Sequence, residues 1–244
     1  MRLAMRFLGV GNAQAQNLGN SSAVLERDGK PILLIDAGSL VPAAWIKRYD
    51  TAIPPAIFIT HTHLDHIGGL EEWFYRIACS SEPVKPVRLF VPATVIPMLH
   101  KRMADDPKHL AEGGVNFWDA FHLIPVNEGF WHEGLKYSTF AVPHHEYLSA
   151  YGLALPGSFL YSGDSRPIPE IIEHFAAGDE VIFHDCASSG NPSHTGLDDL
   201  ERYYTESQRA RMVLYHYESE KAGSLLNEAG YKIARPLQEY SLPS

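Results

Sequence analysis

The sequence has few cysteines, no long apolar run and no excess of positive charge, and each shortage excludes a class of protein. Only Cys79 and Cys186 occur among 244 residues. Two cysteines are too few for a disulfide framework, and these form no CxxC pair that would indicate a thiolate zinc site. No stretch reaches the roughly 18 apolar residues of a membrane-spanning helix, and the first residues lack a signal-peptide core. We therefore expect a cytoplasmic protein without a membrane partner.

The charge balance is acidic and evenly spread. The 20 Lys and Arg residues stand against 29 Asp and Glu residues, which gives a formal net charge of −9 at pH 7. A protein that coats nucleic acid needs clustered positive charge to neutralise phosphates. The composition therefore disfavours extended nucleic acid as a partner and favours a small molecule held in a local site. A homodimer remains open.

Apolar runs and turn residues predict a mixed α/β architecture in one domain, residues 1–244, because no linker, repeat or low-complexity tract divides the chain. The Asp28-Gly29 pair between two apolar runs predicts a β-hairpin. We expect strands at residues 5–10, 22–27, 31–36, 56–60, 87–91, 120–125, 135–142, 150–155, 158–162, 180–184 and 211–216. We expect helices near residues 40–49, 93–103, 166–176, 196–207 and 221–229, and another beginning near Asp65. This order predicts two mixed β-sheets packed face to face with helices outside them; residues 104–119 are either a lid or a plain loop.

Histidine is the abundant residue, with 13 in the chain, and it is densest directly after the apolar run 56–60. There the sequence reads His61-Thr-His63-Leu-Asp65-His66. An extended segment places residues 61 and 63 on one side, and a helix starting near Asp65 turns Asp65 and His66 toward the same cavity. Imidazole and carboxylate ligands suit zinc, manganese or iron. The alternative, a surface cluster without ligands, fits poorly with the apolar strand before it.

Further candidate ligands stand directly after later apolar runs. They are His144 and His145 after residues 135–142, Asp164 after 158–162, and His216 after 211–215. An isolated histidine at a strand end is more often an ordinary polar residue. Two metal ions, however, need more ligands than the four at residues 61–66. This shortage favours the later strand-end residues as ligands.

In this order the motifs resemble the metallo-β-lactamase-fold hydrolase superfamily, and the resemblance covers nearly the whole chain. The HxHxDH signature stands intact at residues 61–66, after an early acid in Ile35-Asp36-Ala-Gly38. A later histidine, a Gly-Asp after a strand and a final histidine follow. The resemblance implies an αββα sandwich with a dinuclear metal site at one edge of the two sheets, and it implies that Asp36 orients the motif from behind.

The resemblance also implies a division of ligands between two divalent ions that share the Asp164 carboxylate. One ion would be bound by His61, His63 and His144, and the other by Asp65, His66 and His216. His144 is preferred to its neighbour His145 because its spacing to the Tyr151-Gly152 pair is similar to that in other members. Zinc is favoured because histidine dominates the ligands, although manganese or iron also fits.

Four further segments look like the phosphodiesterase branch, which includes the tRNase Z endonucleases. Two belong to the opening of the chain, Phe7-Leu-Gly-Val-Gly-Asn-Ala13 and Asn20-Ser-Ser-Ala-Val24. The other two are Phe183-His-Asp-Cys186 and Ser193-His-Thr195. By that likeness Asp185 and His194 are candidates for proton transfer to the leaving group. The structural alternatives are that His194 caps a helix starting near Thr195 and that His184 and Asp185 form a buried, hydrogen-bonded pair at a strand end. No Gly- and Pro-rich arm is present, and an Asp replaces the branch's Glu, which disfavours a true tRNA nuclease.

These observations predict a dinuclear metal-dependent hydrolase that cleaves a small or nucleotide-type phosphodiester through a hydroxide bridging the metals. The catalytic candidates are Asp65, Asp185 and His194. An acyl hydrolase acting on a lactone or thioester remains an alternative, because the same metal site serves both chemistries. A noncatalytic metal-binding domain is a second alternative. A redox diiron protein is disfavoured by His63, where a carboxylate would be expected.

Overall fold

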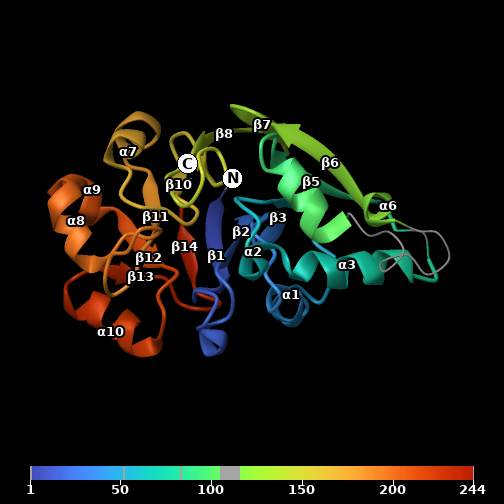
Figure 1. Ribbon diagram of the computed structural model, residues 1–244, viewed down its shortest axis with the longest axis horizontal. Helices are drawn as coiled ribbons and strands as arrows, with labels where there is room; N and C mark the ends of the chain where they lie inside the picture. Colours follow the sequence, from blue (N-terminus) through green and yellow to red (C-terminus); the bar gives the residue numbers. More distant parts are fainter. Residues whose placement is uncertain (1, 52, 83, 105–115, 244) are drawn as a thin grey trace.

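The computed structural model describes residues 2–51, 53–82, 84–104 and 116–243. Two seven-stranded sheets pack face to face (Figure 1). Helices α1 (Val41–Tyr49) and α3 (Gly69–Ala78) lie outside one sheet, and the helices from α7 (Pro169–Phe175) to α10 (Glu220–Glu228) lie outside the other. This arrangement confirms the expected αββα sandwich of two mixed sheets. Most of the segment 104–119, expected as a lid or loop, lies outside the described residues, but its end forms the short helix α6 (Phe117–Ala120). No helix in the described ranges is long and apolar enough to cross a membrane.

The first sheet is built mainly from the N-terminal half of the chain. Its strand order is β14-β1-β2-β3-β4-β5-β6, antiparallel as far as β3 and parallel from β3 to β6. The strands are β1 (Leu3–Gly9), β2 (Ser22–Arg27), β3 (Lys30–Ile35), β4 (Ala56–Phe58), β5 (Val87–Pro92), β6 (Phe121–Val126) and β14 (Glu239–Ser241). The Asp28-Gly29 turn joins β2 to β3 with both residues at positive φ, 50° and 77°, which confirms the hairpin.

The second sheet comes from the C-terminal half and mirrors this plan. Its order is β13-β12-β11-β10-β9-β8-β7, parallel from β13 to β10 and antiparallel from β10 to β7. The strands are β7 (Gly129–His132), β8 (Leu135–Ala141), β9 (Tyr151–Leu155), β10 (Phe159–Tyr161), β11 (Val181–Asp185), β12 (Met212–Tyr215) and β13 (Lys232–Ile233). Since β8, β10, β11 and β12 run in one direction, their carboxyl ends meet at the same edge of the sheet.

Alternation along the inner strands divides the apolar side chains between two cores. On β4, Phe58 contributes to the core between the sheets, whereas Ile57 faces the core beneath the outer helices. Trp45 of α1 (Val41–Tyr49) and Trp73 of α3 (Gly69–Ala78) fill that second core and are fully buried. Strands with apolar groups on both faces read as continuous apolar runs, which explains why residues 56–60 contain no polar residue before Thr60.

Two expected helices are wrong as single elements. Residues 93–103 contain a short helix, α4 (Ile96–Leu99), followed by a π-helical turn, η2 (His100–Ala104). Residues 196–207 contain α8 (Leu197–Tyr203) and α9 (Glu206–Ala210), because Thr205 starts a new helix with a capping box to Gln208. The remaining helical elements are η1 (Gln16–Leu18), α2 (Leu64–Ile67), α7 (Pro169–Phe175) and α10 (Glu220–Glu228).

The last strand joins the two ends of the chain. β14 pairs with β1 through Ala4, Met5 and Arg6, so the final residues complete the sheet that the first residues begin. The Arg6 guanidinium also lies 2.5 Å from the Glu239 carboxylate. This pairing was absent from the sequence-based expectations, as were β7 and β13.

Candidate metal centre

The candidate ligands gather where strand ends from both sheets face each other. His61 and His63 follow β4 of the first sheet, and α2 begins at Leu64 directly after them. From the second sheet, Asp164 follows β10 and His216 follows β12, two strands separated only by β11. Parallel strands bring such residues to a single edge, which is the usual position of ligand sites in α/β sheets.

One carboxylate oxygen lies at the centre of this cluster. Asp164 Oδ2 is 3.2 Å from His216 Nε2 and 3.3 Å from His66 Nε2. It is 3.7 Å from His61 Nε2 and 3.9 Å from His144 Nε2. Two atoms that each lie about 2.0–2.2 Å from one zinc ion at tetrahedral angles are about 3.3–3.6 Å apart. The observed separations therefore suit shared coordination.

The described residues form two adjoining groups that could hold metal ions. The first group comprises His61, His63, His144 and Asp164, and the second comprises Asp65, His66 and His216. Asp164 also lies close to His194 and His216 in an overlapping group. The structure thus brings together all seven residues proposed as ligands, and the Asp164 carboxylate stands between the two groups.

Several buried atoms in this cluster have no hydrogen-bond partner among the described residues. They are Nε2 of His61, Nε2 of His66, Nε2 of His216 and Oδ1 of Asp164. A buried polar atom without a partner carries a desolvation cost of about 1–3 kcal/mol, so it calls for an explanation. Imidazole nitrogens and carboxylate oxygens are the donors that zinc prefers. The residues present therefore fit one or two divalent ions.

Asp36 fixes two of the histidines from behind. Its Oδ2 accepts hydrogen bonds of 2.8 Å from His66 Nδ1 and from Thr60 Oγ1, and its Oδ1 accepts a 2.8 Å bond from Thr60 N. Because the Thr60 hydroxyl donates to Asp36, it accepts from His61 Nδ1 at 3.0 Å. Both imidazoles therefore carry their proton on Nδ1, which leaves Nε2 free as a ligand. This arrangement agrees with the orienting role expected of Asp36.

The second sheet orients its own histidines in the same way. His144 Nδ1 donates to the Ser193 carbonyl at 2.9 Å, and His216 Nδ1 lies 3.4 Å from Asp185 Oδ1. The competing candidate His145 is exposed and contacts the Ser193 hydroxyl at 3.2 Å. It belongs to neither group of possible ligands. His63 differs from the other histidines because it faces the cluster with Nδ1 instead of Nε2. Its Nδ1 lies 3.4 Å from His144 Nε2.

Electrostatics divides the histidines into two kinds. Burial lowers the pKa of His61 well below its usual value and that of His63 to about 4, so both rings are neutral and able to bind metal. Burial also acts on His66 and His216, but attraction from Asp164 outweighs it and raises the pKa of both, to about 10 for His216. The carboxylates therefore favour positive charge at this point, which in the metal-free chain is supplied by protons on these two rings.

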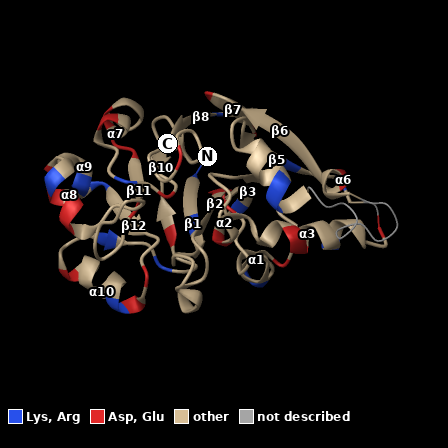
Figure 2. Cartoon of the chain, in the orientation of Figure 1, with Lys and Arg blue, Asp and Glu red and all other residues tan. Residues whose placement is uncertain are grey.

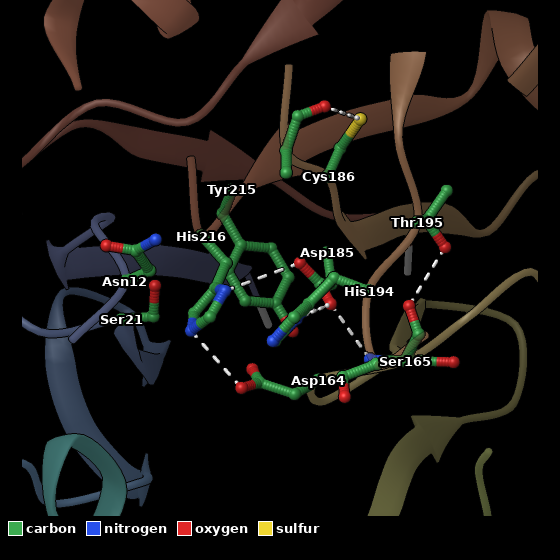
Figure 3. Close-up of polar contacts among 12 residues, drawn as sticks. Asn12, Ser21, Asp164, Ser165, Asp185, Cys186, His194, Thr195, Tyr215 and His216 are labelled. Atoms are coloured by element: carbon green, nitrogen blue, oxygen red, sulfur yellow. Dashed lines mark hydrogen bonds and ion pairs between the residues drawn. The ribbon is translucent and has the colours of Figure 1, made fainter. Parts of the chain in front are cut away.

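Asp185 joins two imidazoles beside the cluster (Figure 3). Its Oδ2 accepts from His194 Nδ1 at 2.8 Å and from Ser165 N at 2.9 Å, while Oδ1 faces His216. Burial lowers the pKa of His194, but the hydrogen bond and charge of Asp185 raise it above its ordinary value overall. Asp185 is completely buried, whereas the His194 side chain is 22% exposed. Only the imidazole is therefore open to a substrate.

The two structural alternatives for this region have different outcomes. The N-cap of α8 is Gly196, whose backbone N–H donates to the Asp199 side chain at 3.0 Å, so the expectation that His194 caps this helix is wrong. His184 and Asp185 are both buried at the end of β11, and His184 Nδ1 donates to the Asp185 backbone carbonyl at 2.7 Å, which confirms the expected buried, hydrogen-bonded pair. His184 Nε2 accepts from the Tyr204 hydroxyl at 2.7 Å, and the Asp185 carboxylate accepts from His194.

Comparison with known proteins gives the chain a family. A family model described as anti-Pycsar protein Apyc1 matches residues 3–240. The chain belongs to the Apyc1 family. The Apyc1 relative from Paenibacillus harenae is 32% identical over 222 residues, which cover 87% of this chain and 89% of that protein.

Solved structures share the fold of this Apyc1-family chain. The metallo-β-lactamase-fold protein YhfI from Bacillus subtilis superimposes with a TM-score of 0.78 at 14% identity and covers 99% of this chain and 100% of that one. The short form of human tRNase Z gives a TM-score of 0.66 at 18% identity, covering 99% and 100%. These likenesses confirm the metallo-β-lactamase fold that the motifs predicted.

Sequence reasoning missed the groups that orient the ligands in this Apyc1-family chain. Thr60 and Ser193 act through a hydroxyl and a backbone carbonyl, neither of which has a motif. Gly38 carried a signal, because it stands two residues after the orienting acid Asp36. A Cβ at Gly38 would lie 2.0 Å from the Asp65 carbonyl, so only glycine lets the Asp36 loop approach the start of α2.

Proposed function

We propose that this chain is a dinuclear metal-dependent hydrolase that cleaves a small nucleotide-type phosphodiester. The observation that carries the proposal is the Asp164 carboxylate with four imidazole Nε2 atoms within 3.9 Å of one oxygen. Each of these imidazoles has its Nδ1 directed to another group, so the Nε2 atoms converge on the same space. Such ordered convergence of otherwise unpartnered ligands indicates a metal centre rather than a polar cluster.

The resident ions would be divalent, and the histidine-rich donors favour zinc, with one ion held by His61, His63, His144 and Asp164 and the other by Asp65, His66 and His216. Such ions polarise the phosphoryl group and make water acidic enough to attack near neutral pH. The carboxylates of Asp65 and Asp164 neutralise the added positive charge.

His194 supplies the proton for the leaving group in this proposal. The oxygen of water gives up a proton to solvent and forms its bond to phosphorus, while the bond from phosphorus to the leaving oxygen breaks and that oxygen takes the proton from His194 Nε2. His194 regains its proton from solvent. Asp185 stabilises the protonated ring and fixes its orientation through the 2.8 Å bond to Nδ1. Asp185 is thus a positioning residue, because its carboxylate is buried and already accepts from Ser165 and His194.

Surface charge supports a small substrate. Figure 2 shows acidic and basic segments interleaved along the elements instead of a basic stripe in this view. With a net charge of −9, the protein lacks a general attraction for a long polyanion. The cavity that opens beside the metal centre has a volume of about 450 Å³, which is within the range of small-molecule sites. A cyclic nucleotide or a short nucleotide diester is the substrate class that we favour.

Metal content is the first test. Purified protein reconstituted with zinc or manganese should carry two ions per chain, and His63→Ala should lose at least one, because His63 belongs to the first ligand group. Elemental analysis after gel filtration measures both values. The matched control is His122→Ala, since His122 is an exposed histidine on β6, outside both groups, and should keep both ions. Metal-free protein after reconstitution would exclude the proposal.

The proton donor gives a second test. His194→Ala should slow an unactivated nucleotide diester by roughly 10²–10⁴-fold, the usual worth of a general acid, but should slow a p-nitrophenyl diester far less, because p-nitrophenolate leaves without protonation. Asp185→Asn should also slow the unactivated diester more than the p-nitrophenyl diester, because Asp185 positions His194, but it should slow both somewhat, because Asp185 Oδ1 also faces the candidate ligand His216. Steady-state kinetics on both substrates measures the ratio.

The exposed His174→Ala on α7 serves as the control and should match wild type on both substrates. Equal losses on both substrates would show damage at the metals and contradict the role of His194. If a lactone or thioester were turned over faster than every phosphodiester, the acyl-hydrolase alternative would replace the proposed function.

A further inference from the structure

The cavity beside the metal centre has a floor of metal-site residues and two walls from different parts of the chain. His61, Thr62 and His63 form the floor. One wall comes from residues 94–102, which include α4 and the start of η2, and the other from residues 144–149. A phosphate bound at the metal centre would therefore place one of its ester groups between these walls.

Each wall presents a large apolar side chain that the core does not use. Met98 is 43% exposed and Tyr147 is 90% exposed, and both line the cavity. An almost fully exposed tyrosine gains little from burial, so packing within the chain does not explain it. Tyr147 instead lines a cavity of ligand size, where its ring is available to a bound molecule.

The turn that carries Tyr147 is held in a strained conformation. Leu148 has φ 60°, a left-handed value that a branched side chain rarely adopts. The Thr94 hydroxyl from the facing wall donates to the Leu148 carbonyl at 2.8 Å, and the Ser149 hydroxyl donates to the Glu146 carbonyl at 2.7 Å. Strain of this kind persists where surrounding contacts fix it, and it is frequent at ligand sites. The two walls therefore keep a set separation.

We propose that Met98 and Tyr147 bind the base of a nucleoside ester between them and so determine the specificity of the site. The inference rests on the proposed phosphodiesterase function and names the part of the substrate that the cavity recognises. A planar base offers two π faces, one to the phenol ring and one to the thioether, and both contacts are favourable whatever the base. An aliphatic ester group has no such faces.

Arg102 adds a polar contact at the same cavity. Its guanidinium donates from Nη1 to the Thr62 carbonyl at 2.7 Å, which fixes the side chain along the wall. Its remaining N–H groups suit the carbonyl oxygens and ring nitrogens of a base. The pocket thus combines two apolar faces with an oriented donor, as nucleobase sites do.

The test compares two diesters that share a leaving group. One is p-nitrophenyl thymidine 5′-phosphate and the other is methyl p-nitrophenyl phosphate, which has no base. Tyr147→Ala should raise the KM of the nucleoside diester about 5- to 100-fold, the usual effect of removing one stacking residue, and leave the methyl diester unchanged. Tyr147→Phe, which keeps the ring, should restore the wild-type KM, and Met98→Ala should raise it as Tyr147→Ala does.

The control is Tyr203→Ala on α8, because Tyr203 is 47% exposed and lies outside the cavity. An unchanged KM for the nucleoside diester in Tyr147→Ala, or equal rises for both diesters, would overturn the inference while leaving the hydrolase intact. If the wild type cleaves no diester, the proposed function fails, and the binding of thymidine 5′-phosphate measured by calorimetry tests the base pocket separately. Weaker binding by Tyr147→Ala than by the wild type then supports a base site at Tyr147, and equal binding refutes it.

Discussion

Asp164→Ala is expected to lower kcat/KM on a phosphodiester by at least about 10³-fold, the upper range for removing one preorganised electrostatic group. The reason is that Asp164 Oδ2 faces four imidazole nitrogens at once, so its loss removes the charge that holds both groups of ligands together. Metal content should fall with activity. The fold should persist, because Asp164 Oδ1 makes no hydrogen bond with the described residues. Kinetics, elemental analysis and circular dichroism measure the three quantities.

Asp179→Asn provides the comparison, since Asp179 is an exposed acid before β11 and should behave as wild type. Asp164→Asn keeps the shape of the side chain and should still lose most activity, which separates the effect of charge from that of a cavity. A fully metallated and active Asp164→Ala protein would contradict the assignment.

Asp36→Ala is expected to reduce the free energy of unfolding by about 3–5 kcal/mol, the range for breaking a buried charged pair. Three buried donors lose their acceptor, namely Thr60 N, Thr60 Oγ1 and His66 Nδ1. For a chain of this length each kcal/mol corresponds to roughly 2–4 °C, so the midpoint should fall by about 6–20 °C. Urea denaturation and thermal melts of the metal-free protein measure the loss.

Asp36→Asn separates stability from ligand orientation. The amide oxygen still accepts from Thr60 N, but an amide NH₂ beside His66 forces that ring to accept on Nδ1 and to carry its proton on Nε2. A protonated Nε2 cannot bind metal, so affinity for the ion at His66 should fall about 10- to 100-fold while the fold survives. An Asp36→Ala protein as stable as wild type would show that the hydrogen bonds of Asp36 to Thr60 and His66 contribute nothing to the free energy of unfolding.

The sequence could indicate that the candidate ligands lie together, because they come directly after apolar strands. That position, the shortage of ligands at residues 61–66 and the family resemblance together led to Asp164 and His216, although the sequence does not state that β10, β11 and β12 are parallel neighbours. The choice between His144 and His145 depends on the direction of one side chain. That direction is set by the Ser193 carbonyl, which lies 49 residues away.

Local rules account for two further outcomes. His184 and Asp185 are consecutive residues of a strand, so their side chains point to opposite faces, and the hydrogen bond between them joins a side chain to a backbone carbonyl. Thr205 and Gln208 form a readable capping box, which marks a helix start inside the expected helix 196–207. The strands β13 and β14 have two and three residues, too few for a periodic pattern, so only long-range pairing defines them.

The pairing of β14 with β1 has a consequence for protein synthesis. Chains fold from the N-terminus as they leave the ribosome, so β1 and β2 are available long before residues 239–241 emerge. Until then one side of β1 presents unpaired N–H and C=O groups, a template on which a second nascent chain can add a strand. We therefore expect the final strand to protect the first one from aggregation, so a chain that ends before Glu239 should be less soluble even though every candidate metal ligand is present.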